Sequence, residues 1–180
     1  MPELGPGATL GQIPSSIGNP TITSEADVDF YGSFDDGSGS SLTGSFAVDE
    51  AGALTLVAGA GFDVPGVPGA TFTWVGPALA NRLGERGVGG FFDGPGVTDE
   101  NGNASFRWDA EGGLTLLVRS GDPAPGTAPG VVYDGPGTPL LNDAGQFAFL
   151  TQLVGPGVSD DNRSALYGPN GSGDLALLAR

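Results

Sequence analysis

The chain of 180 residues contains no cysteine, no histidine and no lysine. The absence of cysteine excludes a disulfide framework and a thiolate metal site. Without these three residue types, the usual general bases, thiol nucleophiles and Schiff-base amines are excluded as well. Carboxylates remain, but most stand in turn sequences such as Asp35-Asp36 and Asp160-Asp161, where a solvated surface role is more common than a catalytic one. We therefore predict that the protein is not an enzyme.

Positive charge is also scarce. Six basic residues, all of them arginine, face 21 acidic residues, and the net charge is −15. A surface of this sign repels phosphate backbones and anionic lipid headgroups, so nucleic acid is not expected as a partner. No apolar run approaches the roughly 18 residues of a membrane span, so membrane insertion is not expected either.

Glycine and proline are abundant, with 34 and 15 residues, a composition often found in disordered chains. Their spacing argues against disorder, because it repeats. A shift of 61 residues, from Asn81 to Asn142, also places the Gly-Pro-Gly-Val sequence at 94–97 on the same four residues at 155–158. The first third of the chain aligns with the last third with more divergence. The sequence therefore predicts one domain of three tandem repeats, at 1–59, 60–120 and 121–180.

Each repeat reads as short strands between turns. In the third repeat a strand is predicted over 146–153, after an Asn-Asp-Ala-Gly turn at 142–145. An asparagine side chain can hydrogen-bond the backbone two residues on, and glycine tolerates positive φ. Apolar side chains at Phe147, Phe149 and Leu153 share one face of this strand. Further strands are expected at 42–48, 104–108 and 165–167, and at 54–57, 114–117 and 175–178; the last set is apolar on both faces, as in a strand packed between layers.

Four antiparallel strands per repeat are typical of a β-propeller blade. Propellers have about 4 to 8 blades, so three blades do not close a ring. The predicted fold class is all-β, with three tandem, four-stranded, β-propeller-like repeats. Either two chains combine into about six blades, or the repeats belong to a longer array. The alternative is a closed three-fold fold similar to a β-prism or a β-trefoil.

The best-preserved repeat sequence, NDAGQFAFLTQL at 142–153, has the form Asn-x-x-Gly-x-x-Ala-Phe. It resembles the NxxGxxAF tandem-repeat proteins, a family of exported bacterial surface proteins. The loop Gly-Asp-Pro-Ala-Pro-Gly-Thr at 121–127 is similar to the joint between the repeats of that family. The resemblance implies export, an extracellular or cell-surface location and a propeller-like fold, and it implies no catalytic residues.

The sharpest candidate for a cofactor site is the turn Asp-Glu-Asn-Gly-Asn at 99–103. Its side-chain oxygens have a spacing similar to that of calcium-binding loops, and a related turn follows in the third repeat. The EF-hand pattern fails, because Ala104 stands at its sixth position and Ala110 at its twelfth. A polar turn without a bound ion is the competing interpretation. The candidate calcium ligands are Asp99, Asn101, Asn103, Asp160 and Asn162.

The functional prediction follows from the number of repeats. Trp74 and Trp108 do not occupy equivalent repeat positions, so packing is favoured over a glycan-binding role for them. We predict a non-enzymatic structural or interaction module of a secreted or cell-surface bacterial protein. The module would associate with itself through its repeat faces, most simply as a homodimer with about six blades. The alternative is a calcium- or glycan-binding module that uses its turn loops.

Overall fold

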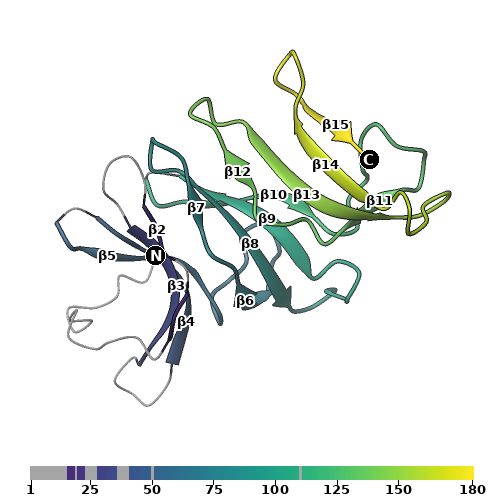
Figure 1. Cartoon of the computed structure of the whole chain (residues 1–180). Helices are drawn as coiled ribbons and strands as arrows, with labels where there is room; N and C mark the ends of the chain where they lie inside the picture. Colours follow the sequence, from purple (N-terminus) through teal and green to yellow (C-terminus); the bar gives the residue numbers. More distant parts are fainter. Residues whose placement is uncertain (1–15, 19, 23–27, 36–40, 50, 110) are drawn as a thin grey trace.

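The computed structural model describes residues 16–18, 20–22, 28–35, 41–49, 51–109 and 111–180. Within these ranges all regular elements are strands, and they form three antiparallel sheets that follow one another along the chain (Figure 1). The prediction of an all-β fold with three antiparallel repeats is confirmed. Over the same residues, no helix has the length and apolar character needed to cross a membrane.

Each sheet has a path of four hydrogen-bonded strands, and a short fifth strand pairs with the second strand of that path. The first sheet contains β1 (Ser16–Ile17), β2 (Thr21–Ile22), β3 (Val28–Asp35), β4 (Ser41–Val48) and β5 (Leu54–Gly59). The second sheet contains β6 (Thr71–Val75), β7 (Leu79–Ala80), β8 (Arg86–Asp93), β9 (Asn103–Trp108) and β10 (Leu114–Arg119). The third sheet contains β11 (Val132–Asp134), β12 (Leu140–Leu141), β13 (Phe147–Val154), β14 (Ser164–Pro169) and β15 (Leu175–Ala179).

The strand registers show that the sheets are copies of one unit. In each sheet the two longest strands pair so that an apolar residue of one stands opposite an aromatic residue of the other. Between the second and third sheets, both members of the pair differ by the 61-residue shift that aligns the sequence. These cross-strand pairs are Phe30–Phe46, Val88–Phe106 and Phe149–Tyr167.

One type of turn recurs between the strands, and it has a simple sequence signature. Asn142 Oδ1 accepts hydrogen bonds from the backbone N–H groups of Ala144 and Gln146, each at 3.0 Å. Gly145 of this turn has a φ of 73°, a backbone conformation that favours glycine. Related turns, each with an Asn or Asp followed three residues later by a Gly of positive φ, begin at Asp49, Asn81, Asp109 and Asn170.

The core of each repeat lies on one face of its sheet. Along β13, Phe149, Thr151 and Leu153 are buried, whereas Leu150 and Val154 are exposed, which confirms the alternation predicted for this strand. The loop that precedes the sheet covers the buried face, since the Tyr167 hydroxyl donates a hydrogen bond to the carbonyl oxygen of Pro125 at 3.0 Å. The second repeat is built in the same way, with residues 64 and 67 of its preceding loop in the core.

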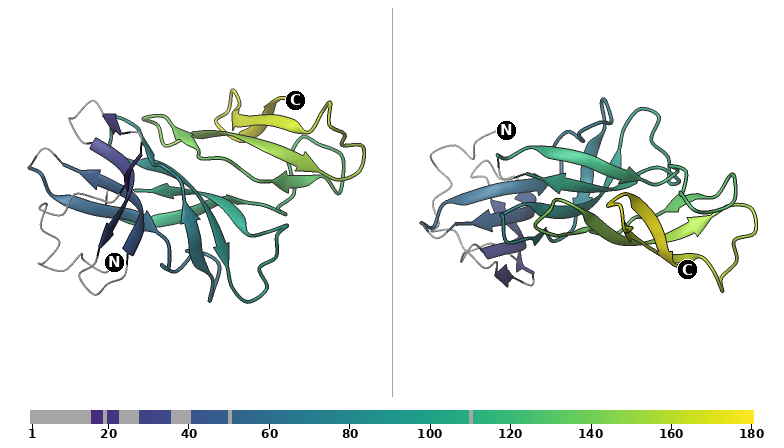
Figure 2. Two further views of the ribbon diagram at one scale, coloured as in Figure 1. Left: turned by 60° about the horizontal axis from the view of Figure 1, so that its bottom comes forward. Right: turned by 90° about the horizontal axis from the view of Figure 1, so that it is seen from above.

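The three sheets stand in an open row. The second sheet lies between the first and the third, and the first and third sheets lie at opposite ends in each view (Figures 1 and 2). The described residues therefore do not close into the three-fold barrel that a β-prism or β-trefoil would require. Among the described residues, each sheet packs against the sheet next to it in the sequence. Two joints between neighbouring sheets therefore hold the row together.

Candidate interaction surface

The joint between the first and second sheets is made by β6, which packs against β4 and β5. The hydroxyl oxygen of Ser45 on β4 accepts a hydrogen bond from the backbone N–H of Ala78 at 2.7 Å, and both residues are buried. A buried ion pair crosses the same joint, with Arg86 Nε 2.7 Å from Asp29 Oδ1. The loop at 76–78 thus sits on the face of the first sheet.

At the joint between the second and third sheets, the short strand β12 lies against β7 and β8. The Ser105 hydroxyl donates a hydrogen bond to the carbonyl oxygen of Gly137 at 2.7 Å. The two backbones approach closely, because a Cβ atom added to Gly87 would lie 1.8 Å from the carbonyl oxygen of Pro139. Only glycine permits this approach.

The two joints use related positions but differ in their contacts, since Ser45 accepts from a backbone N–H and Ser105 donates to a backbone carbonyl. Ser45 and Ser105 stand next to the matching aromatic residues of β4 and β9, and Ala78 and Pro139 precede the matching short strands β7 and β12. We name the sheet face that the next repeat covers its trailing face. We name the loop between the first two strands of a repeat its leading segment; its described residues are Gly18 and Pro20 in the first repeat, 76–78 in the second and 135–139 in the third.

A β-bulge in the last hairpin of each repeat adds one residue to the trailing face. Between β9 and β10 the register passes from Leu116 to Val118, which leaves Leu117 as the extra residue. The extra residues of the other two sheets are Val57 and Leu178. Bulges redirect side chains, and here Val57 is buried in the cluster shared with the second sheet, while Leu117 packs against the cluster of the third. The bulge residue therefore belongs to the joint with the next repeat.

The trailing face of the third sheet ends the row, and within the described residues no further repeat packs on it (Figure 2). Leu150 is 68% exposed and Leu178 is 49% exposed, whereas Val57, the counterpart of Leu178, is 5% exposed. Leu178 lies over Gly168, where an added Cβ would meet its Cδ1 atom at 2.8 Å. We name this surface the open face; its residues are Ala148, Leu150, Leu166, Gly168 and Leu178.

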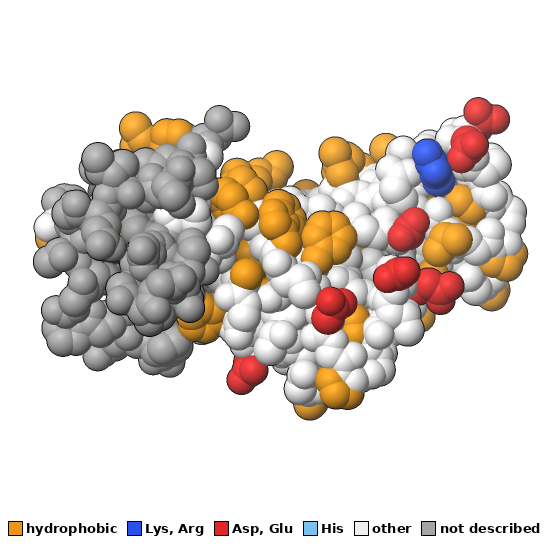
Figure 3. Space-filling view, turned by 90° about the horizontal axis from the view of Figure 1, so that it is seen from below, with side chains coloured by type: hydrophobic (Ala, Val, Ile, Leu, Met, Phe, Trp, Pro, Cys, Tyr) orange, Lys and Arg blue, Asp and Glu red, His pale blue; other side chains and the backbone are white. Residues whose placement is uncertain are grey.

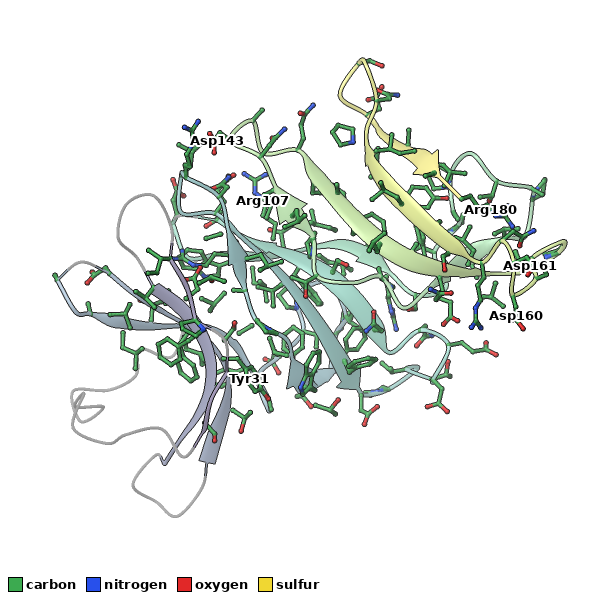
Figure 4. The ribbon with its side chains drawn as sticks, in the orientation of Figure 1. Tyr31, Arg107, Asp143, Asp160, Asp161 and Arg180 are labelled. Carbon is green, nitrogen blue, oxygen red and sulfur yellow. The ribbon has the colours of Figure 1, made fainter. Side chains whose placement is uncertain are left out.

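Further ion pairs lie at the edge of the second joint. Arg82 Nε donates a hydrogen bond to Asp143 Oδ2 at 2.8 Å, so that the equivalent turns of the second and third repeats touch. The hydrogen bond from Arg82 holds the pKa of the Asp143 carboxyl below its ordinary value. Arg107, which pairs with Glu85, lies beside this contact (Figure 4). The open face itself carries no charged side chain.

A row of three aromatic rings forms a second exposed apolar feature, at the junction of the first and second sheets. The ring centroids of Tyr31 and Trp74 are 6.4 Å apart, and those of Trp74 and Phe91 are 5.6 Å apart. Hydrophobic side chains gather in the middle of the face seen in Figure 3, and Figure 4 labels Tyr31. The third sheet does not repeat the row, because Asp134 and Gln152 take the places of Trp74 and Phe91 there.

The predicted calcium ligands Asn101 and Asn162 hold equivalent turns together. Asn101 Oδ1 accepts hydrogen bonds from the backbone N–H of Thr98 at 2.8 Å and from Arg119 Nη2 at 3.0 Å. Asn162 Oδ1 likewise accepts hydrogen bonds from the backbone N–H of Ser159 at 2.8 Å and from Arg180 Nη2 at 3.3 Å. An arginine guanidinium group therefore donates a hydrogen bond to each of the two amide oxygens that were predicted to bind calcium.

The structure does not bring the other predicted ligands together with these two. Asp99 and Asp160 are exposed, and Asp160 lies 3.3 Å from Arg163 Nη1. Asn103 begins β9, and its Oδ1 atom is buried without a hydrogen-bond partner among the described residues. Throughout the part of the chain that the structure describes, no group of three carboxylates is arranged to hold a metal ion.

The open face was not predicted from the sequence, although the sequence contains one signal for it. The strand at 175–178 is apolar on both faces, which predicted packing between two layers. The structure provides one of these layers, the core against which Leu175 and Leu177 pack, and leaves the other side of the strand at Leu178 exposed. The open face is the side of this strand that the pattern predicted to be packed and that the structure leaves exposed.

Comparison with known proteins assigns the chain to a family. Residues 3–180 match the model of the family of unknown function DUF7453, and the chain belongs to this family. No curated protein and no solved structure matches the chain.

Proposed function

We propose that this member of DUF7453 is a non-enzymatic structural or interaction module of a secreted or cell-surface protein and that it associates with itself through its repeat faces. In the simplest assembly two copies supply six propeller-like sheets to one ring. The exported location rests on the resemblance of residues 142–153 to NxxGxxAF repeats. The self-association rests on the open face.

A single observation carries the proposal: a surface that is covered at two joints of the chain stays uncovered at the third sheet. At these joints the bulge residues Val57 and Leu117 are packed against the next repeat, whereas Leu178 is exposed. Contiguous exposed apolar patches mark interaction sites in soluble proteins. Because the first two trailing faces bind a repeat of this chain, a repeat of a second copy is the partner that best matches the third.

The energetics require a partner that fits the whole face. Full burial of one exposed leucine contributes about 1.5–3 kcal/mol, so Leu150, Leu166 and Leu178, which are already partly buried, together supply at most about 9 kcal/mol. Bringing two chains together costs about 4–15 kcal/mol. The three leucines do not offset this cost alone. A partner shaped like the next repeat adds the backbone and side-chain contacts that both internal joints display, and a flat apolar surface does not.

The mass of the protein in solution tests the proposal. Light scattering is expected to give at least twice the 17.9 kDa mass of one chain. Leu150→Asp places a carboxylate in the open face and is expected to yield the monomer mass with an unchanged circular dichroism spectrum. Leu83→Asp is the matched control, because Leu83 is also exposed but lies in the turn between β7 and β8. A monomeric wild-type protein with a cooperative fold would refute the proposal.

A second function, glycan binding, is favoured by the aromatic row. Trp74 and Phe91 expose 42% and 50% of their surface, and exposed aromatic side chains present an apolar body suited to stacking. The acidic chain favours an uncharged glycan over an anionic one. Titration with a neutral polysaccharide is expected to change the fluorescence of wild-type protein and not that of Trp74→Ala, which keeps buried Trp108 as a reporter. Equal responses of the two proteins would remove this function.

A further inference from the structure

We infer that the open face of one copy receives the leading segment of the first repeat of a second copy, in a head-to-tail arrangement. This inference rests on the proposed self-association and specifies its geometry. It commits to one occupant, the residues around Pro20 and β2 of another copy of this chain. The contact would reproduce, between chains, the joint that occurs at two places within the chain.

The leading segment of the first repeat, which is the other surface that such a joint needs, is also exposed. Pro20 occupies the position of Ala78 and Pro139 in the leading segment. Ala78 and Pro139 are buried against the preceding sheet, whereas Pro20 is exposed and Ile22 beside it is 78% exposed. Among the described residues, one end of the row therefore presents an unfilled trailing face, and the other end presents an exposed leading segment.

The backbone around Pro20 is held in the same place as its counterparts. Thr21 pairs with Asp29, just as Leu79 pairs with Gly87 and Leu140 pairs with Ala148. Because the short strand that follows each leading segment has the same register on its sheet, the three leading segments project from equivalent positions. The first repeat can then meet a preceding sheet as the second and third repeats do.

The residues of the open face determine which internal joint it resembles. Gly87 allows the closest backbone approach, but its counterpart on the third sheet is Ala148, which carries a Cβ atom. The counterpart on the first sheet is Asp29, and the first joint accommodates that side chain. The contact between copies is therefore expected to have the spacing of the first joint. Leu166 replaces the buried serine of both joints, so apolar contact takes the place of the hydroxyl hydrogen bond.

The arrangement has a defined symmetry. A trailing face and a leading segment are different surfaces, so their contact is heterologous. Heterologous contacts generate a ring where the rotation closes and an open filament where it does not. Two copies of three sheets each make a ring of six, which lies within the range of about 4 to 8 blades found in propellers.

Cysteine cross-linking tests the arrangement, because the chain has no cysteine of its own. Pro20→Cys and Ala148→Cys are prepared in separate copies that differ in tag mass, mixed, and oxidised. In the second joint a Cβ at Gly87 would lie 3.0 Å from Pro139 Cγ, so these two positions are close neighbours. A disulfide needs Cβ atoms about 3.5–4.5 Å apart, which the wider spacing expected between copies favours. The mixed pair is expected to link about tenfold faster or more than a Leu83→Cys and Ala148→Cys control pair, because binding raises the effective concentration of the thiols.

The oligomeric state of two further variants tests the inference without cross-linking. Pro20→Asp and Leu150→Asp are each expected to be monomeric alone and to form a heterodimer when mixed, since the mixture retains one intact pair of surfaces. If Ala148→Cys links to itself faster than to Pro20→Cys, or Pro20→Asp stays dimeric, the copies meet face to face and the inference is overturned while self-association stands. A wild-type protein that is monomeric by light scattering overturns both.

Discussion

Asp29 and Arg86 form a buried ion pair that ties the first sheet to the second. Arg86 Nε lies 2.7 Å from Asp29 Oδ1, and the two side chains are 3% and 1% exposed in that order. Arg86 also donates from Nη1 to the carbonyl oxygen of Gly84, and its guanidinium lies 4.7 Å from the centre of the Trp108 ring. The first joint thus depends on a charge pair that neither the second joint nor the open face repeats.

Replacing one partner of this ion pair should lower the stability of the fold. Arg86→Met leaves the Asp29 carboxylate buried beside an apolar side chain and is expected to lower the free energy of unfolding by about 3–5 kcal/mol. The double variant Asp29→Leu/Arg86→Met removes both charges and should recover most of that loss. Urea unfolding of the wild type, both single variants and the double variant measures the coupling. Additive effects of the two substitutions would contradict this account.

The bulge residues offer a matched pair of substitutions. Val57→Asp buries an unpaired carboxylate in the first joint and should lower the free energy of unfolding by more than about 3 kcal/mol. Leu178→Asp makes the same change at the equivalent exposed position and should alter monomer stability by no more than about 0.5 kcal/mol. Urea unfolding at a dilution where the protein is monomeric makes the comparison. Equal losses for the two variants would show that the open face is not a free surface.

Two tyrosines of the third sheet, Tyr133 and Tyr167, whose rings meet edge to face, are expected to contribute differently to stability. The Tyr133 hydroxyl is buried without a hydrogen-bond partner among the described residues, whereas Tyr167 donates to Pro125. Tyr133→Phe should therefore be neutral or stabilising, and Tyr167→Phe should lower the free energy of unfolding by about 0.5–1.5 kcal/mol. Thermal or urea unfolding at neutral pH measures both. A larger loss for Tyr133→Phe than for Tyr167→Phe would contradict the expectation.

The same burial predicts a dependence on high pH. Burial raises the pKa of Tyr133 above its ordinary value, with smaller contributions from Tyr167 and Asp122. The folded protein then binds the phenol proton more tightly than the unfolded chain, whose tyrosine pKa is about 10. Stability is therefore full below about pH 10 and falls as the pH rises above it. Unfolding midpoints measured across this range should fall less steeply for Tyr133→Phe than for the wild type.

Salt is expected to strengthen self-association. Each copy carries a net charge of −15, while the open face is apolar, so the copies repel each other at long range and attract only on contact. The Debye length shortens from about 10 Å at 0.1 M to about 3 Å at 1 M salt. The dimer fraction in sedimentation velocity should rise over that range. A dimer that dissociates as salt is added would point to an ionic interface elsewhere.

Calcium is expected to leave the protein unchanged, because Arg119 and Arg180 occupy the amide oxygens of Asn101 and Asn162. Melting curves with calcium and with a chelator should coincide for the wild type. Arg119→Gln frees the Asn101 oxygen and serves as the sensitised variant. A rise of the wild-type melting temperature on addition of calcium would restore the metal-binding interpretation of these turns.

The sequence by itself determined the repeat, the strands and the turns. Each of these is encoded locally: the Asn142 side chain and Gly145 define a turn within a few residues, and Phe149 and Leu153 define a buried face by alternation. The resemblance of 142–153 to a repeat family depends on the same short signals. None of them shows how one repeat meets another.

Only the tertiary structure decided the joints. Asp29 and Arg86 are 57 residues apart, and no local pattern marks them as partners. The hydrogen bonds of Asn101 and Asn162 also depend on the tertiary structure, because Arg119 and Arg180 reach them from positions 18 residues further on. The open face also depends on the tertiary structure. Leu178 and Val57 occupy the same place in their repeats, but a neighbouring sheet packs on Val57 and none of the described sheets packs on Leu178.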